Sequence, residues 1–194
     1  MLHVDEIALI EGCRKSHRYA QKVLYERYSN DMFEVCLLYA TDYAVANDLL
    51  QEGFLKVFQN IKKFKQQRSL GGWIRTVMVN NCIDHIRADK WTKNRERLAN
   101  LENHQNIKTS PIALYERDDF LNITSQLPDG YRLILNMYFL EDMTHKEISA
   151  KLNITIGTSK SQLHKAKKYL KDILLRTLRR EEIEEYGGFI KKVV

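Results

Sequence analysis

Apolar residues recur along the chain at the three- and four-residue spacing of helices that bury one face. The clearest run spans 49–61. Its apolar-face positions are Leu49, Leu50, Gly53, Phe54, Val57, Phe58 and Ile61. Similar patterns cover 20–28 and 32–40, and a further helical run covers 73–86 after the polar, glycine-bearing stretch 65–72. These runs predict a helical bundle that ends near Arg87.

The helical periodicity is lost over 89–119 and returns close to Phe120. The segment without periodicity is polar and contains Pro111, so it predicts a linker, with a short helix expected around 95–101. Farther along, Pro128 suits the first turn of a helix, because its missing N–H costs nothing there. This helix is expected to end at 139 or 140.

A capping box follows this helix. The residues 144–147 have the T-x-x-E form, which predicts a short helix that ends near Leu152. After a turn at 153–154, a longer helix is expected to start around 155–157 and to pass Leu175. A short capped helix, a turn and a longer helix are typical of a helix-turn-helix, in which the second helix enters the major groove of DNA.

The predicted fold class is all-α, with an N-terminal helical bundle and a C-terminal helix-turn-helix domain joined by a polar linker. The expected boundaries are 1–90 for the bundle, 91–119 for the linker, 120–178 for the helix-turn-helix domain and 179–194 for a tail without an assigned role. The chain has only 2 Pro and 8 Gly, too few turn signals for a sheet of many strands.

Charge singles out the second helix of the helix-turn-helix. The chain has a net charge of +6, which would suit either nucleic acid or an anionic membrane surface. From Lys160 to Arg180, however, eight basic residues face the single acid Asp172, a net charge of +7 on one segment. The inner face of the motif is expected to contain Ile148, Leu152, Ile154, Leu163, Ala166 and Leu170. Left outside, and predicted to face DNA, are Thr158, Lys160, Ser161, Gln162, His164, Lys165, Lys167 and Lys168.

Several other classes of protein are disfavoured. Cys13, Cys36 and Cys82 are far apart and form no CxxC pair, so they are expected to be buried thiols in a reducing compartment. The chain does not start with a basic segment leading into an apolar run, and no apolar stretch approaches the roughly 18 residues of a membrane-spanning helix. We therefore expect a cytoplasmic protein without membrane insertion.

Catalysis is also not expected. Asp84 and His85 are adjacent, and adjacent helical residues do not converge on one ion. The carboxylates at 181–185 look like a solvated helix face, and the chain has no HExxH, Walker loop or nucleophile elbow. The sequence thus predicts no enzyme, no catalytic residues, no cofactor and no metal site.

Several motifs, in order, resemble those of one family. In the first block they are the string 46–58, then Trp73-Ile74-Arg75 followed by Asn80, Asp84 and Arg87. In the second block they are Leu127-Pro128, Tyr138-Phe139, Lys146-Glu147-Ile148, Gly157-Thr158, Lys160-Ser161 and Leu163-His164-Lys165-Ala166. With these motifs the chain resembles a sigma factor of the extracytoplasmic-function (ECF) type, a promoter-specificity subunit of bacterial RNA polymerase.

The resemblance implies that core RNA polymerase and promoter DNA are the partners. It implies that Asp48, Gln51 and Glu52 dock on the clamp helices of the largest polymerase subunit. Their i, i+3, i+4 spacing puts these three side chains on one helix face, and an acidic face on a basic protein suits a protein better than DNA. An ordinary solvated face is the alternative interpretation.

For the helix that begins near Trp73, the resemblance implies contact with the melted upstream strand of the promoter. The residues expected there are Trp73, Asn80, Asp84 and Arg87, which lie along one helical stripe. A flipped base needs a pocket with stacking and hydrogen-bonding groups, for which Asn80 and the loop 65–72 are the candidates. Trp73 has two interpretations, a core residue or a platform for a base.

On the recognition helix, Lys160, Ser161, His164 and Lys165 are expected to read base edges, although His164 could also be a bystander in the groove. Thr158, Gln162, Lys167 and Lys168 are expected to hold phosphates.

The chain also departs from the family pattern. Leu70, Gly71 and Gly72 stand where the family commonly has an aromatic residue and Ser or Thr ahead of the Trp. Ser159 replaces a usual Val, and Gln162 replaces a usual Arg, which removes one charged phosphate contact.

Two functions follow from these patterns. The first is a sigma factor that binds core RNA polymerase and directs promoter-specific initiation, with its two weak sites linked through effective concentration. The resemblance also implies an anti-sigma protein that covers these faces. The alternative is a free-standing helix-turn-helix regulator with a helical sensor domain, which would not need the face of Asp48, and the match at Trp73 to Arg87 argues against it.

Overall fold

The computed structural model describes residues 6–40, 42–65, 69–97, 123–124 and 126–177, without the side chains of 89–97, 175 and 177. The chain divides into two compact units, Met1–Ala99 and Asn100–Val194. The described residues form helices and no strands, which confirms the predicted all-α fold class.

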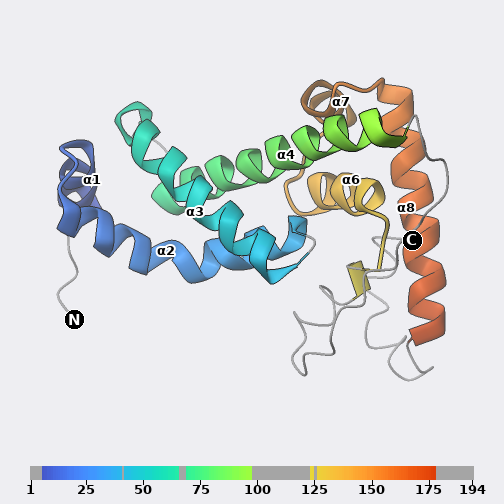
Figure 1. Cartoon of the computed structure of the whole chain (residues 1–194), viewed down its shortest axis with the longest axis horizontal. Helices are drawn as coiled ribbons and strands as arrows, with labels where there is room; N and C mark the ends of the chain where they lie inside the picture. The colour runs from blue at the N-terminus through green and yellow to red at the C-terminus, as the bar shows by residue number, and fades with distance from the viewer. Residues whose placement is uncertain (1–5, 41, 66–68, 98–122, 125, 178–194) are drawn as a thin grey trace. The chain divides into compact units, whose positions relative to one another are not determined.

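The N-terminal unit is built from four α-helices and one 3-10 turn. These are α1 (Glu6–Arg14), α2 (Arg18–Tyr39), α3 (Tyr43–Asn60), η1 (Ile61–Lys63) and α4 (Leu70–Arg97). In Figure 1, α2, α3 and α4 form the body of this unit, where each packs on the other two, and α1 packs on α2 and η1. Their common core includes Leu24, Leu49, Ile74 and Met78, each at most 1% exposed. The predicted bundle is therefore confirmed.

The helix α4 differs from the prediction at both ends. It begins at Leu70, because the Ser69 hydroxyl accepts a hydrogen bond from the Gly72 backbone N–H (3.2 Å) and caps the first turn. The prediction of a loop over 65–72 was thus wrong for its last three residues. At its other end, the helix passes Arg87 and runs to Arg97, so the predicted end near Arg87 was wrong as well. Loss of apolar periodicity does not end a helix whose residues are good helix formers.

The C-terminal unit contains the predicted helix-turn-helix. Its helices are α6 (Asp129–Phe139), α7 (His145–Leu152) and α8 (Ile156–Thr177), and each packs on the other two (Figure 1). Pro128 caps α6 and accepts hydrogen bonds from the N–H groups of Tyr131 (2.8 Å) and Arg132 (3.0 Å). One cluster of its buried core contains Leu127, Leu135, Ala166, Leu170 and Leu174.

Several predictions fall on residues that the structure does not describe. The tail at 179–194 and the part of the linker from 98 to 119 lie outside the described residues, and so do the carboxylates at 181–185. The residues 91–97, expected in the linker, belong to α4 instead. The precise domain boundaries therefore stay predictions.

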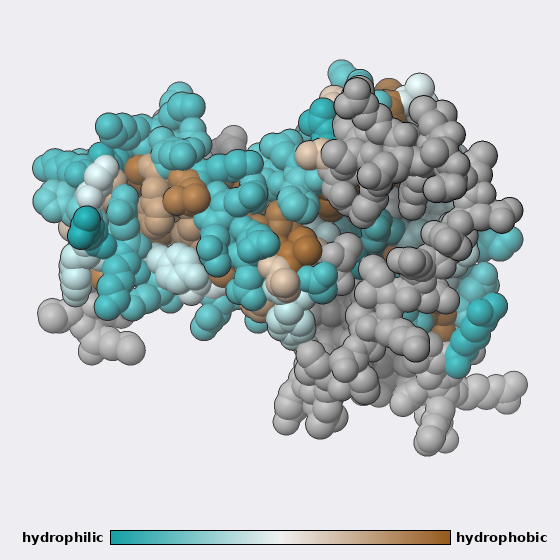
Figure 2. Space-filling view, in the orientation of Figure 1, coloured by the Kyte–Doolittle hydropathy of each residue, from teal (hydrophilic) through white to brown (hydrophobic). Residues whose placement is uncertain are grey.

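The surface and the core of the described residues follow the expected polarity. Hydrophilic residues cover most of the described surface in the view of Figure 2, with apolar residues in small patches between them. Cys13, Cys36 and Cys82 are all buried, as predicted. Within the described part of the chain, no helix is both long enough and apolar enough to span a bilayer.

Candidate functional site

The outer face of α3 contains the acidic group predicted from the sequence. Asp48, Gln51 and Glu52 are all exposed, while the neighbouring Leu49 and Phe54 are buried at 1% and 2%. The helix begins with Asp42 as its N-cap, whose carboxylate accepts from the Val45 N–H (2.9 Å). The structure thus brings the three polar side chains to one solvent-facing surface.

An apolar side chain lies on this same surface. Leu55 is 61% exposed and stands seven, four and three residues after Asp48, Gln51 and Glu52, so all four share one face of the helix. The sequence interpretation missed Leu55. The available signal was that Leu55 is the apolar residue of the run 49–61 that lies off the buried stripe.

The backbone of α3 lies close against α4. The buried Asn81 donates from its side-chain amide to the Leu49 carbonyl (2.9 Å), across 32 residues of chain. A Cβ atom at Gly53 would overlap Sδ of Met78, so the buried Met78 side chain of α4 fills the space that this glycine leaves open. The position of the α3 outer face is therefore set by contacts from α4.

The predicted strand-binding residues lie along α4 with different exposures. Trp73 and Asn80 are partly buried, and Asp84 and Arg87 are exposed and form an ion pair with an N–O distance of 3.7 Å. The Trp73 ring packs on the ring of the buried Phe64, with centroids 5.3 Å apart. Trp73 therefore contributes to the core and still reaches solvent.

On α8 the predicted outward residues divide into two groups. Lys160, Ser161, His164, Lys165 and Lys168 are exposed. Thr158, Gln162 and Lys167 are partly buried. The Thr158 hydroxyl is 2.8 Å from that of Thr155, the residue that caps the helix, and the ammonium of Lys167 lies 5.3 Å from the ring centroid of Phe139. Thr158 and Lys167 thus have partners within the unit itself.

Local signals position α7 ahead of α8. Thr144 and Glu147 form the predicted capping box, in which the Glu147 carboxylate accepts from the Thr144 N–H (2.8 Å) and hydroxyl (2.7 Å). The hydrogen bond from the Thr144 backbone, followed by that from its side chain, lowers the pKa of Glu147 below the ordinary glutamate value. The helix ends at Asn153 in the left-handed conformation (φ 52°), which asparagine tolerates.

A polar contact joins α7 to α8. Ser159 is fully buried, and its hydroxyl lies 3.0 Å from Nδ1 of His145 at the start of α7. The His145 ring also stacks on Tyr138 of α6, with centroids 5.0 Å apart. Ser159, noted from the sequence as a departure from the family, therefore has a hydrogen-bonding partner where a valine would have none.

Two family sequence models match the chain. The model of Sigma-70 region 2 matches residues 24–92, and the model of Sigma-70 region 4 matches residues 117–170. The ECF RNA polymerase sigma factor SigM of Bacillus subtilis is 32% identical over 156 residues, which cover 79% of this chain and 94% of SigM. The chain belongs to the family of ECF RNA polymerase sigma factors.

Further relatives agree with this assignment. The ECF sigma factor SigW of Bacillus subtilis is 22% identical, over 84% of this chain and 92% of SigW. Among solved structures, the sigma factor RpoE in complex with the anti-sigma factor NepR from Bartonella quintana matches with a TM-score of 0.50. This match covers 81% of this chain and 98% of that one at 17% identity, and it supports the fold.

As a member of this family, the sigma factor binds core RNA polymerase and directs promoter-specific initiation of transcription. The helices α3 and α4 lie in the region 2 match, apart from the last five residues of α4, and α6, α7 and most of α8 lie in the region 4 match. The alternative of a free-standing regulator is therefore set aside. The helix α1 precedes the region 2 match.

Proposed function

We propose that the two units of this sigma factor bind different partners during initiation. The N-terminal unit (1–90) holds core polymerase with α3 and the melted upstream strand with α4. The C-terminal unit (120–178) reads the duplex upstream element with α8. The linker (91–119) raises the effective concentration of each site for its own target once the other is bound.

The polymerase-docking surface consists of Asp48, Gln51, Glu52 and Leu55 on α3. Acidic side chains repel DNA phosphates, so this surface suits a protein partner with basic groups. Binding hot spots combine an apolar anchor that becomes desolvated with polar groups around it, and the exposed Leu55 among three polar neighbours has this arrangement. The proposed docking surface rests on this exposed leucine beside three exposed polar residues.

On α4, we assign Trp73 and Asn80 to an unstacked base of the melted strand. A partly exposed indole ring offers a stacking surface, and an amide offers both a donor and an acceptor. Asp84 and Arg87 neutralise each other in their ion pair, so a phosphate can approach Arg87 without meeting an unpaired carboxylate.

On α8, we assign Lys160, Ser161, His164 and Lys165 to base edges, because all four are exposed. Phosphate contacts are assigned to Thr158, Gln162, Lys167 and Lys168. Lys167 would have to leave the Phe139 ring to reach a phosphate.

We further propose three properties of this sigma factor. It acts without catalysing a reaction itself, and it works in the cytoplasm together with core polymerase. The related RpoE of Bartonella quintana was solved in complex with an anti-sigma factor. By analogy, an anti-sigma protein would inhibit this chain by covering the α3 and α8 faces.

The test combines pull-down of purified core polymerase with run-off transcription on a library of promoter fragments. The wild-type chain should bind core and produce discrete start sites. Gln51→Ala/Glu52→Ala should weaken core binding and leave duplex binding unchanged, whereas the matched pair Gln21→Ala/Glu26→Ala on α2 should bind core normally. Deletion of 127–175 should keep core binding and abolish initiation at ordinary promoters. Binding of duplex DNA without binding of core would refute the proposal.

A further inference from the structure

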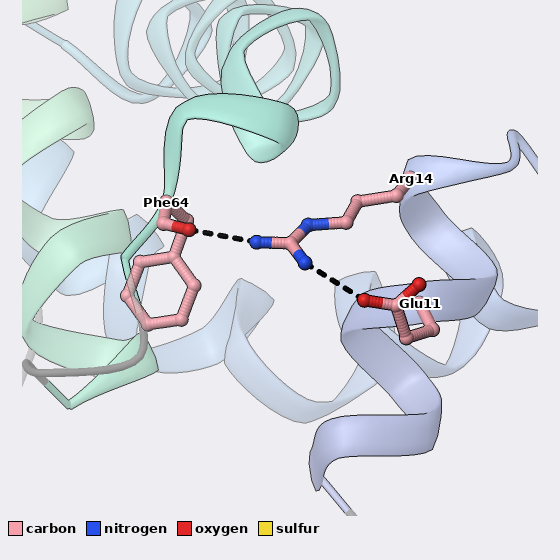
Figure 3. A network of polar contacts seen from close by, with 3 residues as sticks. All are labelled: Glu11, Arg14 and Phe64. Carbon is pink, nitrogen blue, oxygen red and sulfur yellow. Dashed lines mark hydrogen bonds and ion pairs between the residues drawn. The ribbon is translucent and has the colours of Figure 1, made fainter.

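An arginine at the end of α1 binds the segment ahead of α4 (Figure 3). The guanidinium of Arg14 donates to the Phe64 carbonyl (2.8 Å) and to the Glu11 carboxylate (2.7 Å). Phe64 is the C-cap residue of η1, and carbonyl groups at the end of a helix have no hydrogen-bond donor within the helix. Arg14 thus binds the C-terminal end of η1, although it lies 50 residues earlier in the sequence.

The turn after α1 places Arg14 next to the Phe64 carbonyl. Ser16 adopts the left-handed conformation (φ 59°), and the N–H groups of Ser16 and His17 donate to the carbonyls of Cys13 and Gly12, both at 3.0 Å. This pair of hydrogen bonds is a Schellman motif, which ends the helix at Arg14. A Cβ atom at Gly12 would come within 2.6 Å of the Ala20 Cβ, so α1 packs tightly against α2.

The contact made by Arg14 continues from Phe64 to Trp73. The Phe64 ring is 3% exposed and packs on the Trp73 ring, so the place of the indole depends on where the Phe64 backbone is held. A second link starts at the beginning of α1, where Glu6 accepts from the Tyr28 hydroxyl (3.4 Å). The Tyr28 ring would lie 3.1 Å from a Cβ atom at Gly71, in the first turn of α4. The helix α1 is therefore linked to Phe64, which packs on Trp73, and through Tyr28 to the first turn of α4, the helix that contains Trp73.

We propose that α1 positions Trp73 for capture of the melted promoter strand, and that Arg14 is the positioning residue. This inference rests on the proposed role of Trp73 in strand binding. It assigns a task to a helix that lies before the residues matched by the region 2 model. Arg14 acts through Phe64 and does not itself contact DNA.

The contacts of Arg14 suit a residue that positions Phe64 better than one that stabilises the fold. Its ion pair with Glu11 is 28% and 48% exposed, and such pairs contribute little to stability. Among the described residues, its Nε is buried without a hydrogen-bond partner, which opposes the gain from the other two bonds. Arg14→Met, which keeps the length and loses both bonds, should therefore still fold.

Trp73 fluorescence in the full-length chain tests the positioning directly. In a Trp91→Phe background, Trp73 is the remaining tryptophan of the 2 in the chain. Arg14→Met should shift its emission and make it easier to quench with acrylamide, and Arg14→Lys should restore part of the wild-type signal. Glu11→Gln, which spares the Phe64 bond, and Arg18→Ala, which removes an exposed arginine of α2, should leave the signal unchanged. Unchanged emission and quenching in folded Arg14→Met would overturn the inference.

The second measurement is the affinity for single-stranded promoter DNA. In holoenzyme assembled with core polymerase, Arg14→Met should lower affinity for a single-stranded upstream promoter oligonucleotide by about 3- to 10-fold, the size of an ordinary net hydrogen-bond contribution. Core binding and duplex binding should stay at the wild-type level. If Trp73→Ala itself leaves strand binding unchanged, the proposed role of Trp73 fails, and the fluorescence result still decides whether Arg14 positions the ring. If Trp73→Ala weakens strand binding and Arg14→Met does not, the inference fails alone.

Discussion

The outer faces of α3 and α8 have the same periodicity and opposite chemistry. Both helices bury one apolar stripe and leave polar side chains outside. The sequence of α3 contains two acids and one base, whereas that of α8 contains six bases and one acid. Each helix also exposes a large apolar or aromatic side chain among its charges, Leu55 (61% exposed) among the acids of α3 and Tyr169 (50% exposed) among the bases of α8. Periodicity therefore identifies the buried side of a helix, while charge and exposed apolar groups indicate its partner.

The two helices also differ in what positions them. Local signals define the helix-turn-helix, namely the capping box at Thr144 and Glu147, the left-handed Asn153 and the Thr155 cap. The helix α3 also has a local cap at Asp42, but its outer face is positioned by α4, through Asn81 and the close approach of Gly53 to Met78. Substitutions in the two units should therefore act on different partners and for different reasons.

Reversal of charge on α8 should have the largest effect. In Lys160→Glu/Lys165→Glu, two groups proposed to read bases would repel the phosphates, and each lost base contact costs about 1–3 kcal/mol. We expect the holoenzyme to lose affinity for the duplex upstream element by about 100-fold, measured by fluorescence anisotropy. Core binding should not change.

The control for this variant is Lys15→Glu/Arg18→Glu, which makes the same charge change on exposed residues of the N-terminal unit. A loss of duplex affinity equal to that of the α8 variant would mean that total charge, and not the α8 face, governs binding.

The next largest effect is expected at Leu55. Leu55→Glu places a charge at the proposed apolar anchor, and truncation of such hot-spot residues costs about 2 kcal/mol or more. We therefore expect a loss of core affinity of roughly 30-fold, measured by competition with the wild-type chain for core polymerase. Ile7→Glu, at a 55% exposed position of α1, should bind core normally. If both variants compete equally well for core polymerase, Leu55 does not belong to the docking surface.

One substitution made in both helices should have opposite effects. Gly53→Ala introduces a Cβ that overlaps Met78, and such overpacking costs about 1–3 kcal/mol of stability. At Gly157 in α8, the added Cβ would meet only the Thr155 hydroxyl oxygen at 3.7 Å, an ordinary contact. Gly157→Ala should therefore be neutral or slightly stabilising. Urea denaturation measures both, and a smaller cost of Gly53→Ala in a Met78→Ala background than in the wild-type chain would confirm the clash as the cause.

The smallest effect concerns the capping box in acid. Because hydrogen bonds lower the pKa of Glu147 in the folded chain, the folded state binds the Glu147 proton less readily than the unfolded state does. The stabilisation is therefore present at neutral pH and is lost as the pH falls through the lowered pKa. The protection of the α7 amides against hydrogen exchange, measured relative to the intrinsic rate at each pH, should fall over this range, and Glu147→Gln should reduce this pH dependence. Glu26→Gln on α2 is the control, and an identical pH response in Glu147→Gln would show that another group is responsible.

Much of the fold could be predicted because its signals are local. Pro128 and the capping box were confirmed as starts of helices, and the turn at Asn153 was confirmed between α7 and α8. The two runs at 20–28 and 32–40 proved to be one helix, α2, because neither Gly nor Pro interrupts it. The start of α4 was placed too late, since the cap at Ser69 was not recognised ahead of two glycines.

By itself, the sequence determined which residues form amphipathic helices, where the basic charge is concentrated and which family the motifs resemble. These properties depend on residue type and spacing within one segment. Only the tertiary structure decided that Leu55 is exposed, that Asn81 and Gly53 bring α3 against α4, and that Arg14 reaches Phe64. Such contacts join residues about 25 to 50 positions apart, and their geometry depends on how whole helices pack, which no local pattern encodes.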